Sequence, residues 1–455
     1  MQSPAHAAPS PTPAAPNEPA EFLAANPDIE LVELLLPDTN GIFRGKWVPP
    51  SHLAALYKDG LALAKSVFAV DAWGRDVLAT GLFHETGDRD GCARPVPGTL
   101  RRMPWAERPT AQLMLRMADE DGQPFFADPR TILERAAAAL AARGLFPVVA
   151  FELEFYLLEL DEAGRPVFAG SAGGPDRSDV YSMADLRTYG DLFAEIETTA
   201  HGLGVPTDTI ISEAAARQFE VNLRHVGDPV AAADHALLLR RIVRRVAHRH
   251  GLRASFMAKP FVERSGNGMH VHLSLTDRDG RNVYGAAPDG EALLHQSLGG
   301  LLATMADAAL PFVSTFNGFR RLAGPYTPSK ALWAENNRYV ALRLPRAGPS
   351  ARRIEHRVAG ADANPHLVLA AILAGVARGL DRKLGAPPPV EGDAGAVAAE
   401  ALPPTMRHAL ERFRDSDWVT EAFGAEWRDF YARVKDQELA GFEAHVCPLE
   451  LDTYL

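Results

Sequence analysis

Apolar and polar residues alternate in short runs over roughly the first 120 residues, which predicts strands rather than helices. Residues 29–48, DIELVELLLPDTNGIFRGKW, place apolar runs on both sides of a Pro-Asp-Thr-Asn-Gly turn, a strong hairpin signal. Another strand is predicted at 112–117, QLMLRM, and the polar run DEDGQP follows it at 119–124. We therefore expect a strand-rich N-terminal domain over 28–120, with a boundary directly after it.

The remaining residues show alternating helical and strand periods. A helix is predicted at 131–145 with Asp128 as its cap, and the apolar run VVAFELEFYLLEL predicts a long strand that ends at 160. Further helices are predicted near 185–203, 229–250, 290–309 and 365–382, and further strands at 254–261 and 269–276. Neither a G-x-G-x-x-G motif nor a P-loop occurs. Strands that line a funnel, backed by helices, predict an α+β enzyme with a catalytic domain over 127–455.

Composition restricts the class of protein. The chain has 455 residues, of which 47% are hydrophobic and 23% charged, and these are ordinary values for a globular enzyme. Its net charge of −11 argues against a nucleic-acid partner, which needs a positive excess. Its two cysteines, Cys92 and Cys447, form no disulfide framework, and no apolar run approaches the length of a membrane span. The Pro/Ala-rich residues 1–20 predict a disordered tail without a signal sequence, so a cytoplasmic location is expected.

The clearest chemical signal is a set of polar pairs spaced two residues apart within apolar runs. The pairs are Glu152/Glu154, His270/His272 and Glu355/Arg357. Residues i and i+2 of a strand point to the same face, so each pair directs two polar groups to one side. Each buried ion without a partner destabilises the fold by roughly several kcal/mol. A ligand site therefore explains the pairs better than chance, although two histidines alone are as often structural as metal-binding.

Two further glutamates, in ISEAAARQFEVNL at 210–222, have an ambiguous pattern. Glu213 and Glu220 are seven residues apart, and EAAAR is good helix sequence, so a solvated helix is at least as well supported by this segment alone. Together with the strand pairs, however, they would give an oxygen-rich set of ligands. Such a set favours Mg²⁺ or Mn²⁺ over Zn²⁺.

Arginine dominates the cationic residues between 320 and 357, where Lys330 is the only lysine. The planar guanidinium group recognises carboxylates and phosphates, so this bias predicts oxyanion binding, although the whole chain is rich in arginine. Hard dications beside arginines are typical of phosphoryl transfer. The arginines of this stretch are Arg320, Arg321, Arg338, Arg343, Arg346, Arg352, Arg353 and Arg357.

Five ordered motifs together resemble the glutamine synthetase family. They are FELEFYLL, ISEAAARQFEVNL, FMAKPF followed by GNGMHVHLSL, NNRYVALRLP and RRIEHRVAGADANPHLVLAAILAG. The N-terminal ELLLPDTNGIFRGKW is similar to the branch of this family that joins glutamate to putrescine and other polyamines. The resemblance implies an N-terminal β-grasp domain, a larger catalytic domain, and a dodecamer of two hexameric rings with active sites between neighbouring subunits. It also implies that Glu213 and Glu220 lie in strand and loop rather than in a helix.

The resemblance further implies two or more Mg²⁺ or Mn²⁺ ions and the residues that bind them. Glu154, Glu213 and Glu220 would hold one ion, and Glu152, His270 and Glu355 the other. The substrate glutamate would be bound by Ser265, Gly266, Arg321 and Arg357, with Ser265 at a position where glutamine synthetases usually have asparagine.

ATP would be bound by a second set of residues that the resemblance identifies. Arg338 and Arg343 would contact its phosphates, and Arg338 would also stabilise the transferring phosphoryl group. His272 and Ser274 would line the nucleotide site, and Asp208 matches an acidic position on the nucleotide side. Asp90 matches an acidic loop position that reaches the site of a neighbouring subunit. Ser350 stands where the family has a nucleotide-side lysine, and Arg352 is a candidate to replace it.

The chain departs from ammonia-using members at the positions that form their ammonium cage. Their flap glutamate is replaced by Thr327, and Asp71 does not align with their ammonium-binding aspartate. We therefore expect an ATP-dependent ligase that joins L-glutamate to a primary amine, putrescine or another polyamine, through a γ-glutamyl phosphate. Trp333 and Glu335 are candidates for binding an ammonium tail, and a purely structural role fits both residues equally well. The alternatives are an ammonia-using glutamine synthetase, an inactive assembly or regulatory member of the family, and a Mg²⁺-dependent hydrolase or lyase.

Overall fold

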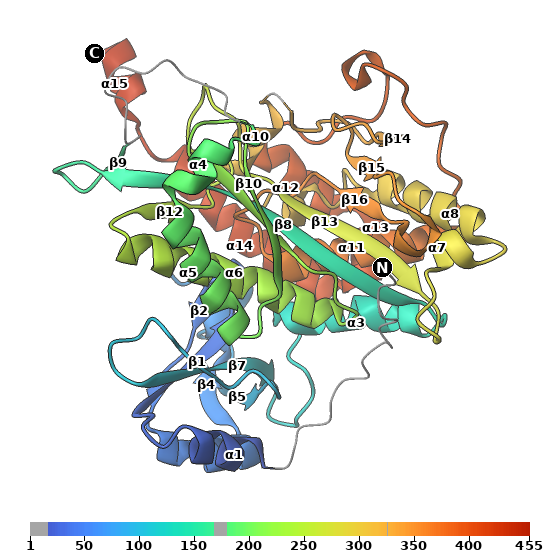
Figure 1. Cartoon of the computed structure of the whole chain (residues 1–455). Coiled ribbons are helices and arrows are strands. Elements are labelled where there is room, and N and C mark those ends of the chain that lie inside the picture. The colour runs from blue at the N-terminus through green and yellow to red at the C-terminus, as the bar shows by residue number, and fades with distance from the viewer. Residues whose placement is uncertain (1–16, 168–179, 325) are drawn as a thin grey trace.

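The computed structural model describes residues 17–167, 180–324 and 326–455, which form two β-sheets with helices around them (Figure 1). The N-terminal sheet has seven strands in the order β2-β1-β7-β5-β4, with β3 also paired to β1 and β6 to β7. Its strands are β1 (Leu31–Pro37), β2 (Phe43–Arg44), β3 (Trp47–Val48), β4 (Leu61–Ala64), β5 (Asp90–Pro95), β6 (Arg101–Arg102) and β7 (Thr110–Ala118). Helices α1 (Glu18–Ala25) and α2 (Leu53–Asp59) accompany it.

The predicted turn after the first strand forms as expected. The Asp38 carboxylate accepts hydrogen bonds from the backbone N–H groups of Asn40 and Ile42, both at 2.9 Å. Gly41 has φ +69, a conformation that glycine adopts without a steric penalty. β1 and β7 pair in parallel at the centre of the sheet, an arrangement consistent with a β-grasp fold.

The second sheet has nine strands in the order β10-β11-β8-β13-β16-β15-β14, and the short strands β9 and β12 also pair with β8. β8 (Phe146–Leu160) is the long strand that crosses the middle of Figure 1. The others are β9 (Pro166–Val167), β10 (Thr207–Ser212), β11 (Gln218–Leu223), β12 (Arg253–Ser255), β13 (Met269–Thr276), β14 (Trp333–Glu335), β15 (Leu342–Leu344) and β16 (Ile354–His356). β8 therefore organises this sheet, and the α+β class predicted from the sequence is confirmed.

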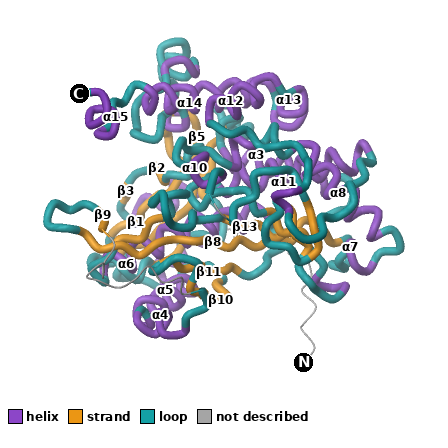
Figure 2. The backbone as a smooth tube through the Cα atoms, turned by 90° about the horizontal axis from the view of Figure 1, so that it is seen from above, coloured by secondary structure: helices purple, strands orange, loops and turns teal. Residues whose placement is uncertain are grey.

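Helices lie on both sides of β8 and β13 when the molecule is viewed from above (Figure 2). α3 (Pro129–Ala141) begins at the predicted cap, because the Asp128 carboxylate accepts from the backbone N–H of Arg130. α11 (Pro365–Arg382) packs against both α3 and α8. The other helices are α4 (Met183–Thr188), α5 (Gly190–Gly202), α6 (Pro229–Arg249), α7 (Val283–Ala286), α8 (Gly290–Thr304), α9 (Ala309–Phe312), α10 (Gly318–Leu322), α12 (Met406–Asp415), α13 (Asp417–Phe423), α14 (Ala425–Glu443) and α15 (Pro448–Tyr454).

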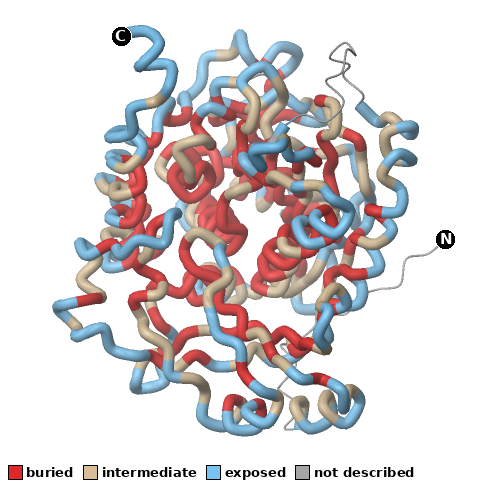
Figure 3. Tube along the Cα trace, turned by 90° about the vertical axis from the view of Figure 1, so that its left-hand side faces the viewer, coloured by how far each residue is buried: buried red, intermediate tan, exposed pale blue. Residues whose placement is uncertain are grey.

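Most buried hydrophobic residues belong to one large core that includes residues of both sheets, beside two small clusters, and Figure 3 shows buried residues concentrated at the centre of the molecule. The linker between the sheets lies at the predicted boundary, between the end of β7 and the start of α3. The division into two domains remains our proposal. Within the described part of the chain, every helix is too short or too polar to cross a lipid bilayer.

Three local predictions need comment. The helical interpretation of 210–222 is wrong, because β10 and β11 form an antiparallel pair there. The strand expected at 254–261 is only the three-residue β12. Residues 1–16 of the expected tail lie outside the described residues, whereas Glu18–Ala20 already belong to α1.

Candidate metal and substrate site

The register of the large sheet brings the polar pairs of four strands to one place. Glu154 on β8 stands directly opposite Glu220 on β11, and Glu152 stands opposite His270 on β13. On the far side of β13, His272 is paired with Glu355 of β16. Cross-strand neighbours point to the same face of a sheet, so these side chains converge.

His270 lies at the centre of this cluster. Its Nδ1 is 3.2 Å from Glu152 Oε2 and 4.0 Å from Glu355 Oε1, and its Nε2 is 3.8 Å from Glu154 Oε1. A proton on Nδ1 donated to Glu152 leaves the lone pair of Nε2 available to a cation. The imidazole therefore links three carboxylates that come from two strands.

Among the residues that the structure describes, three groups of side chains have ligand atoms that lie within 4.8 Å of one another inside each group, a spacing that suits a metal ion. One group is the predicted set Glu154, Glu213 and Glu220. The other two groups each contain two members of the second predicted set and one neighbour. In the first, Glu152 and His270 are joined by Glu220, and in the second, Glu152 and Glu355 are joined by His272. His272, predicted on the nucleotide side, thus also approaches the cluster.

The electrostatics of the cluster show an excess of negative charge. Burial and the charges of Glu152, Glu154 and Glu213 raise the pKa of Glu220 well above its usual range. Burial and the charge of Glu154 raise the pKa of Glu213 to about 8. Carboxylates that repel one another in this way are stabilised by a bound cation, and an oxygen-rich set fits a hard dication such as Mg²⁺ or Mn²⁺.

Two further carboxylates of the cluster, Glu355 and Glu152, have partners that lower their pKa. Burial opposes ionisation of Glu355, which is 1% exposed, but the charges of Arg357, His270 and His272 outweigh it and lower its pKa to about 2. Arg343 Nη1 donates to Glu355 Oε2 at 2.7 Å, and Arg357 Nη1 donates to Oε1. Burial likewise opposes ionisation of Glu152, whereas hydrogen bonds with His270 and His272 lower its pKa.

Two residues hold parts of the predicted site in place: Arg353, for which sequence reasoning predicted only a general part in oxyanion binding, and Gln218, which it missed. Arg353 Nε donates to His272 Nδ1 at 3.0 Å, so the proton of His272 resides on Nε2, which donates to Glu152 Oε1 at 2.7 Å. Gln218 Nε2 donates to Gly266 O and Asn267 Oδ1, both at 3.0 Å. The place of Arg353 at the site could have been found, since it shares the two-residue period of Glu355 and Arg357. No local signal identifies Gln218.

The residues predicted to bind glutamate lie beside the carboxylates. Arg321 is buried and donates to the carbonyl oxygens of Val358 (2.8 Å) and Arg357 (3.4 Å). Gly266 has no room for a side chain, because a Cβ atom would lie 2.6 Å from Ala258 O and 2.7 Å from Arg321 Cγ. The carbonyl oxygen of Ser265 accepts from the Tyr156 hydroxyl at 2.7 Å. Gly266 thus allows the backbone and Arg321 to approach closely.

The residues predicted to bind ATP are more dispersed. Arg338 is exposed, and its Nη1 donates to the Tyr181 hydroxyl at 3.1 Å. Ser274 Oγ donates to Arg352 O at 3.1 Å, and the Arg352 guanidinium pairs with Glu291 at 2.8 Å. Asp208 is exposed and lies 3.6 Å from Arg224. Of this set, His272 and Arg343 make direct contacts with the carboxylate cluster.

Two expected residues lie elsewhere. Asp90 begins β5 in the N-terminal sheet and is exposed, separate from the cluster on the large sheet (Figure 1). Trp333 is 3% exposed, its Nε1 donates to Pro387 O at 2.7 Å, and its ring meets His295 edge-on. The expectation that Trp333 binds an ammonium tail is therefore wrong, because its ring is a packing element of the core.

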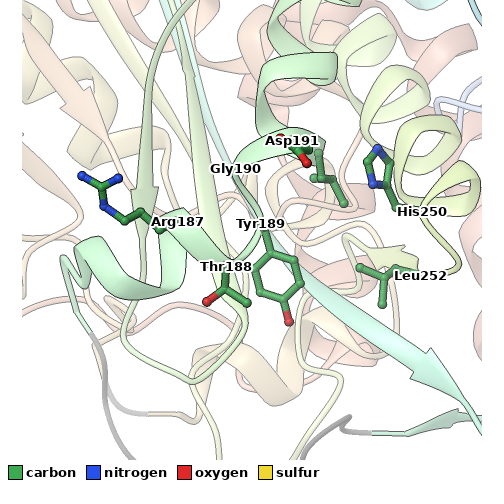
Figure 4. A pocket seen from close by; sticks show the side chains of 8 residues that line it. Arg187, Thr188, Tyr189, Gly190, Asp191, His250 and Leu252 are labelled. Carbon is green, nitrogen blue, oxygen red and sulfur yellow. The ribbon is translucent and has the colours of Figure 1, made fainter.

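A separate small pocket of about 320 Å³ lies where α4 meets α5, near the end of α6 (Figure 4). Its lining includes Tyr189, Asp191 and His250. His250 Nε2 is 3.0 Å from Glu195 Oε2, so this imidazole is already paired. The pocket shares no residue with the carboxylate cluster.

Comparisons with known proteins agree with this geometry. The profile described as "Glutamine synthetase, catalytic domain" matches residues 126–454. The chain is 40% identical to gamma-glutamylputrescine synthetase PuuA of Escherichia coli (strain K12) over 445 residues, which cover 95% of this chain and 93% of PuuA. It is 30% identical to glutamate–isopropylamine ligase of a Pseudomonas species, with 94% and 95% covered. Among solved structures, GmaS without ligand has a TM-score of 0.82 at 28% identity and covers 95% of this chain and 98% of GmaS.

Proposed function

Because this chain belongs to the glutamine synthetase family, we propose that it is an ATP-dependent ligase that joins the γ-carboxyl group of L-glutamate to a primary amine. The observation that carries this function is the full-length similarity to a gamma-glutamylputrescine synthetase and to a glutamate–isopropylamine ligase. A gamma-glutamylethanolamide synthetase of Streptomyces coelicolor (strain ATCC BAA-471 / A3(2) / M145), at 31% identity, adds a third amine-using relative. Putrescine or another polyamine is the proposed acceptor.

The carboxylate cluster is the proposed binding site for two Mg²⁺ or Mn²⁺ ions. Glu154, Glu213 and Glu220 would hold one ion, and their mutual spacing supports this assignment. Glu152, His270 and Glu355 would hold the other, with His272 fixed beside them by Arg353. Such ions, when bound, would offset the negative charge of the phosphate groups during phosphoryl transfer.

The residues of this chain divide the work of two chemical steps. Gly266, Ser265, Arg321 and Arg357 would orient glutamate so that its γ-carboxylate attacks the γ-phosphate of ATP and displaces ADP. Arg338 and Arg343 would stabilise the charge on the transferring phosphoryl group, while His272, Ser274, Asp208 and Arg352 would line the nucleotide site. The amine then attacks the acyl carbon of γ-glutamyl phosphate, phosphate leaves, and the amide forms. Electrostatic stabilisation by preorganised charges is the main contribution expected of such a site.

Two residues support an amine rather than ammonia as the acceptor. Thr327 stands where ammonia-using members have a flap glutamate. Asp71 is fully engaged by its own turn and by α14, because its carboxylate accepts from the backbone N–H groups of Trp73 and Arg75, from Arg75 Nε and from Gln437 Nε2. It therefore has little capacity left to bind or deprotonate ammonium.

The oligomeric proposal is a dodecamer of two hexameric rings, as in the family. In this arrangement the exposed Asp90 would serve the site of a neighbouring subunit, which explains its distance from the cluster of its own chain. Size-exclusion chromatography with light scattering tests the subunit number.

Phosphate release tests the activity. The enzyme is supplied with ATP, glutamate, Mg²⁺ and either 1,4-diaminobutane or ammonia, and the product is identified by mass spectrometry. We expect amide formation that requires ATP and a larger kcat/KM with the diamine. Faster turnover with ammonia would support a glutamine synthetase instead, turnover without ATP would support a hydrolase or lyase, and a lack of turnover with every amine would support an inactive family member.

A further inference from the structure

Two exposed tyrosine rings lie close together on connecting segments of the catalytic domain, one beyond α10 and one between β14 and β15, elements that Figure 1 labels. Tyr326 lies in the segment that follows α10, and Tyr339 lies in the loop between β14 and β15. Their ring centroids are 6.0 Å apart with an interplanar angle of 32°, and the residues are 61% and 57% exposed. Within the chain segments that the structure covers, neither hydroxyl group has a hydrogen-bond partner. The pair is therefore accessible to a ligand rather than part of the core.

Both tyrosines belong to segments that are anchored to the candidate site. Arg343 donates to Glu355 Oε2 at 2.7 Å and also to Asn336 Oδ1 at 3.0 Å, so the loop that carries Tyr339 is tied to the carboxylate cluster. Tyr326 follows α10, whose Arg321 donates to the carbonyl oxygen of Arg357. The two rings thus stand where these two segments leave the site.

The backbone at one of the rings adopts an unusual conformation. Tyr326 has φ +64, in the left-handed region that bulky residues rarely occupy, whereas Asn336 has φ +51, a conformation that asparagine adopts readily. Conformations like that of Tyr326 persist only where the surrounding structure enforces them, and they concentrate at functional sites. This second observation, independent of the ring exposure, indicates a loop shape selected for a task.

The chemistry of a diamine acceptor requires a particular kind of pocket at this place. The attacking nitrogen must be neutral, whereas the distal nitrogen of a diamine remains a charged ammonium near neutral pH. A carboxylate beside the distal end would compete for the metal ions that the cluster is proposed to bind. Aromatic faces attract an alkylammonium group through their quadrupole without adding negative charge.

We propose that Tyr326 and Tyr339 bind the distal ammonium group of a diamine or polyamine acceptor by cation–π contacts and so select it over simple monoamines. This inference rests on the proposed ligase function, of which it names the acceptor site. Both rings contribute, because an ammonium group can approach two rings 6.0 Å apart within the usual cation–π distance of about 6 Å.

The test compares two acceptors of equal length, 1,4-diaminobutane and n-butylamine, of which only the first carries a distal ammonium. In Tyr339→Ala we expect KM for the diamine to rise about three- to tenfold, while KM for n-butylamine changes less than about twofold. Tyr339→Phe keeps the ring and should keep the wild-type ratio of the two KM values. KM for glutamate and the melting temperature are measured for each variant, and Tyr326→Ala provides the same comparison should Tyr339→Ala not fold.

The outcomes separate the inference from the function on which it rests. Wild-type enzyme that forms no amide with any amine, hydroxylamine included, overturns the ligase function itself. If the wild type is active but Tyr339→Ala leaves KM for 1,4-diaminobutane and for n-butylamine unchanged, or raises both equally, only the aromatic site is overturned. A Tyr339→Phe variant as impaired as Tyr339→Ala assigns the effect to the hydroxyl group and also overturns the cation–π assignment.

Discussion

Glu154 and Gly268 are joined by two hydrogen bonds: the backbone N–H of Glu154 donates to Gly268 O at 3.0 Å, and the backbone N–H of Gly268 donates to Glu154 Oε2 at 2.7 Å. These two bonds orient the Glu154 carboxylate and hold β8 against the segment that leads into β13. A Cβ atom at position 268 would lie 2.8 Å from both Arg321 Nη2 and His270 Nε2. Glu154, Arg321 and His270 thus depend on the lack of a side chain at this one position.

We therefore expect Gly268→Ala to lower kcat/KM by about 100-fold or more, because displacement of positioned groups by about 1 Å is enough for such a loss. Gly202→Ala is the matched control, since nothing lies within 4 Å of the Cβ that it would add. Steady-state phosphate release measures both variants. Activity of Gly268→Ala equal to that of the control would show that the contact does not position the site.

Removal of one buried carboxylate should change stability and activity in opposite directions. Glu220 is buried among carboxylates that raise its pKa, so folding at neutral pH carries the cost of protonating this group. The neutral side chain of Glu220→Gln avoids that cost and should stabilise the metal-free protein by about 1 kcal/mol or more. The same variant loses a proposed metal ligand, so activity and the rise in melting temperature on addition of Mg²⁺ should both fall. Thermal unfolding in EDTA and in Mg²⁺ measures both effects. A variant that keeps the full Mg²⁺-induced rise would refute the metal assignment of Glu220.

Arg353 should act on metal affinity through His272. In Arg353→Met the hydrogen bond that fixes the proton of His272 on Nε2 is lost, and we expect the affinity for Mn²⁺ to fall about 10- to 100-fold. Titration calorimetry with Mn²⁺ measures this directly. Arg278→Met, at an exposed turn arginine, is the control, and equal affinities in the two variants would mean that Arg353 has no part in the site.

His356 predicts a pH dependence of folding stability. Its side chain is buried against Phe312, and burial followed by the charge of His270 lowers its pKa to about 3. An unfolded chain binds a proton at this histidine below about pH 6.5, whereas the folded chain does not, so its contribution to stability is present above about pH 6.5 and is lost as the pH falls toward 3. At pH 5 the loss is about 2 kcal/mol. Urea unfolding of wild type and His356→Phe between pH 7 and 5 should show a smaller loss in the variant, and parallel curves would contradict this account.

The flap position should control the choice between amine and ammonia. Thr327→Glu would restore the carboxylate of ammonia-using members, so we expect a lower kcat/KM for 1,4-diaminobutane and a measurable rise in ammonia-dependent glutamine formation. Thr327→Gln has nearly the same size without the charge and is the control. Equal behaviour of the two variants would assign the effect to size alone.

Sequence patterns predicted the parts of the site that lie on single strands. The two-residue period placed Glu152 with Glu154 and His270 with His272, because the alternation of a strand is a local property. Glu213 and Glu220 stayed ambiguous, since a spacing of seven also suits a helix. What decides their structure is the pairing of β11 with β8, in which Glu220 meets Glu154, and this partner lies 66 residues earlier in the chain.

Long-range packing also explains the other differences. Trp333 has an aromatic ring and a place in the chain that suit an ammonium site. Its indole N–H, however, donates to the carbonyl oxygen of Pro387, more than fifty residues later, and no local pattern reveals that partner. Tyr339 belongs to a motif that resembles the family, yet its nearness to Tyr326 follows only from the way two loops meet. Helix caps such as Asp128 were predictable because cap and helix are adjacent.

Paired strands carry the proposed metal ligands, whereas the two tyrosines of the proposed acceptor site come from connecting segments, so the two sites belong to separate parts of the fold. β8 is paired in register with β9, β11, β12 and β13. A one-residue insertion in β8 before Glu152 would therefore move Glu152 and Glu154 to the opposite face of the sheet and should abolish ligase activity. Exchange of the connecting segments leaves that framework intact. New acceptor preferences are therefore best sought in libraries confined to 323–329 and 336–340, with the strand sequences held constant.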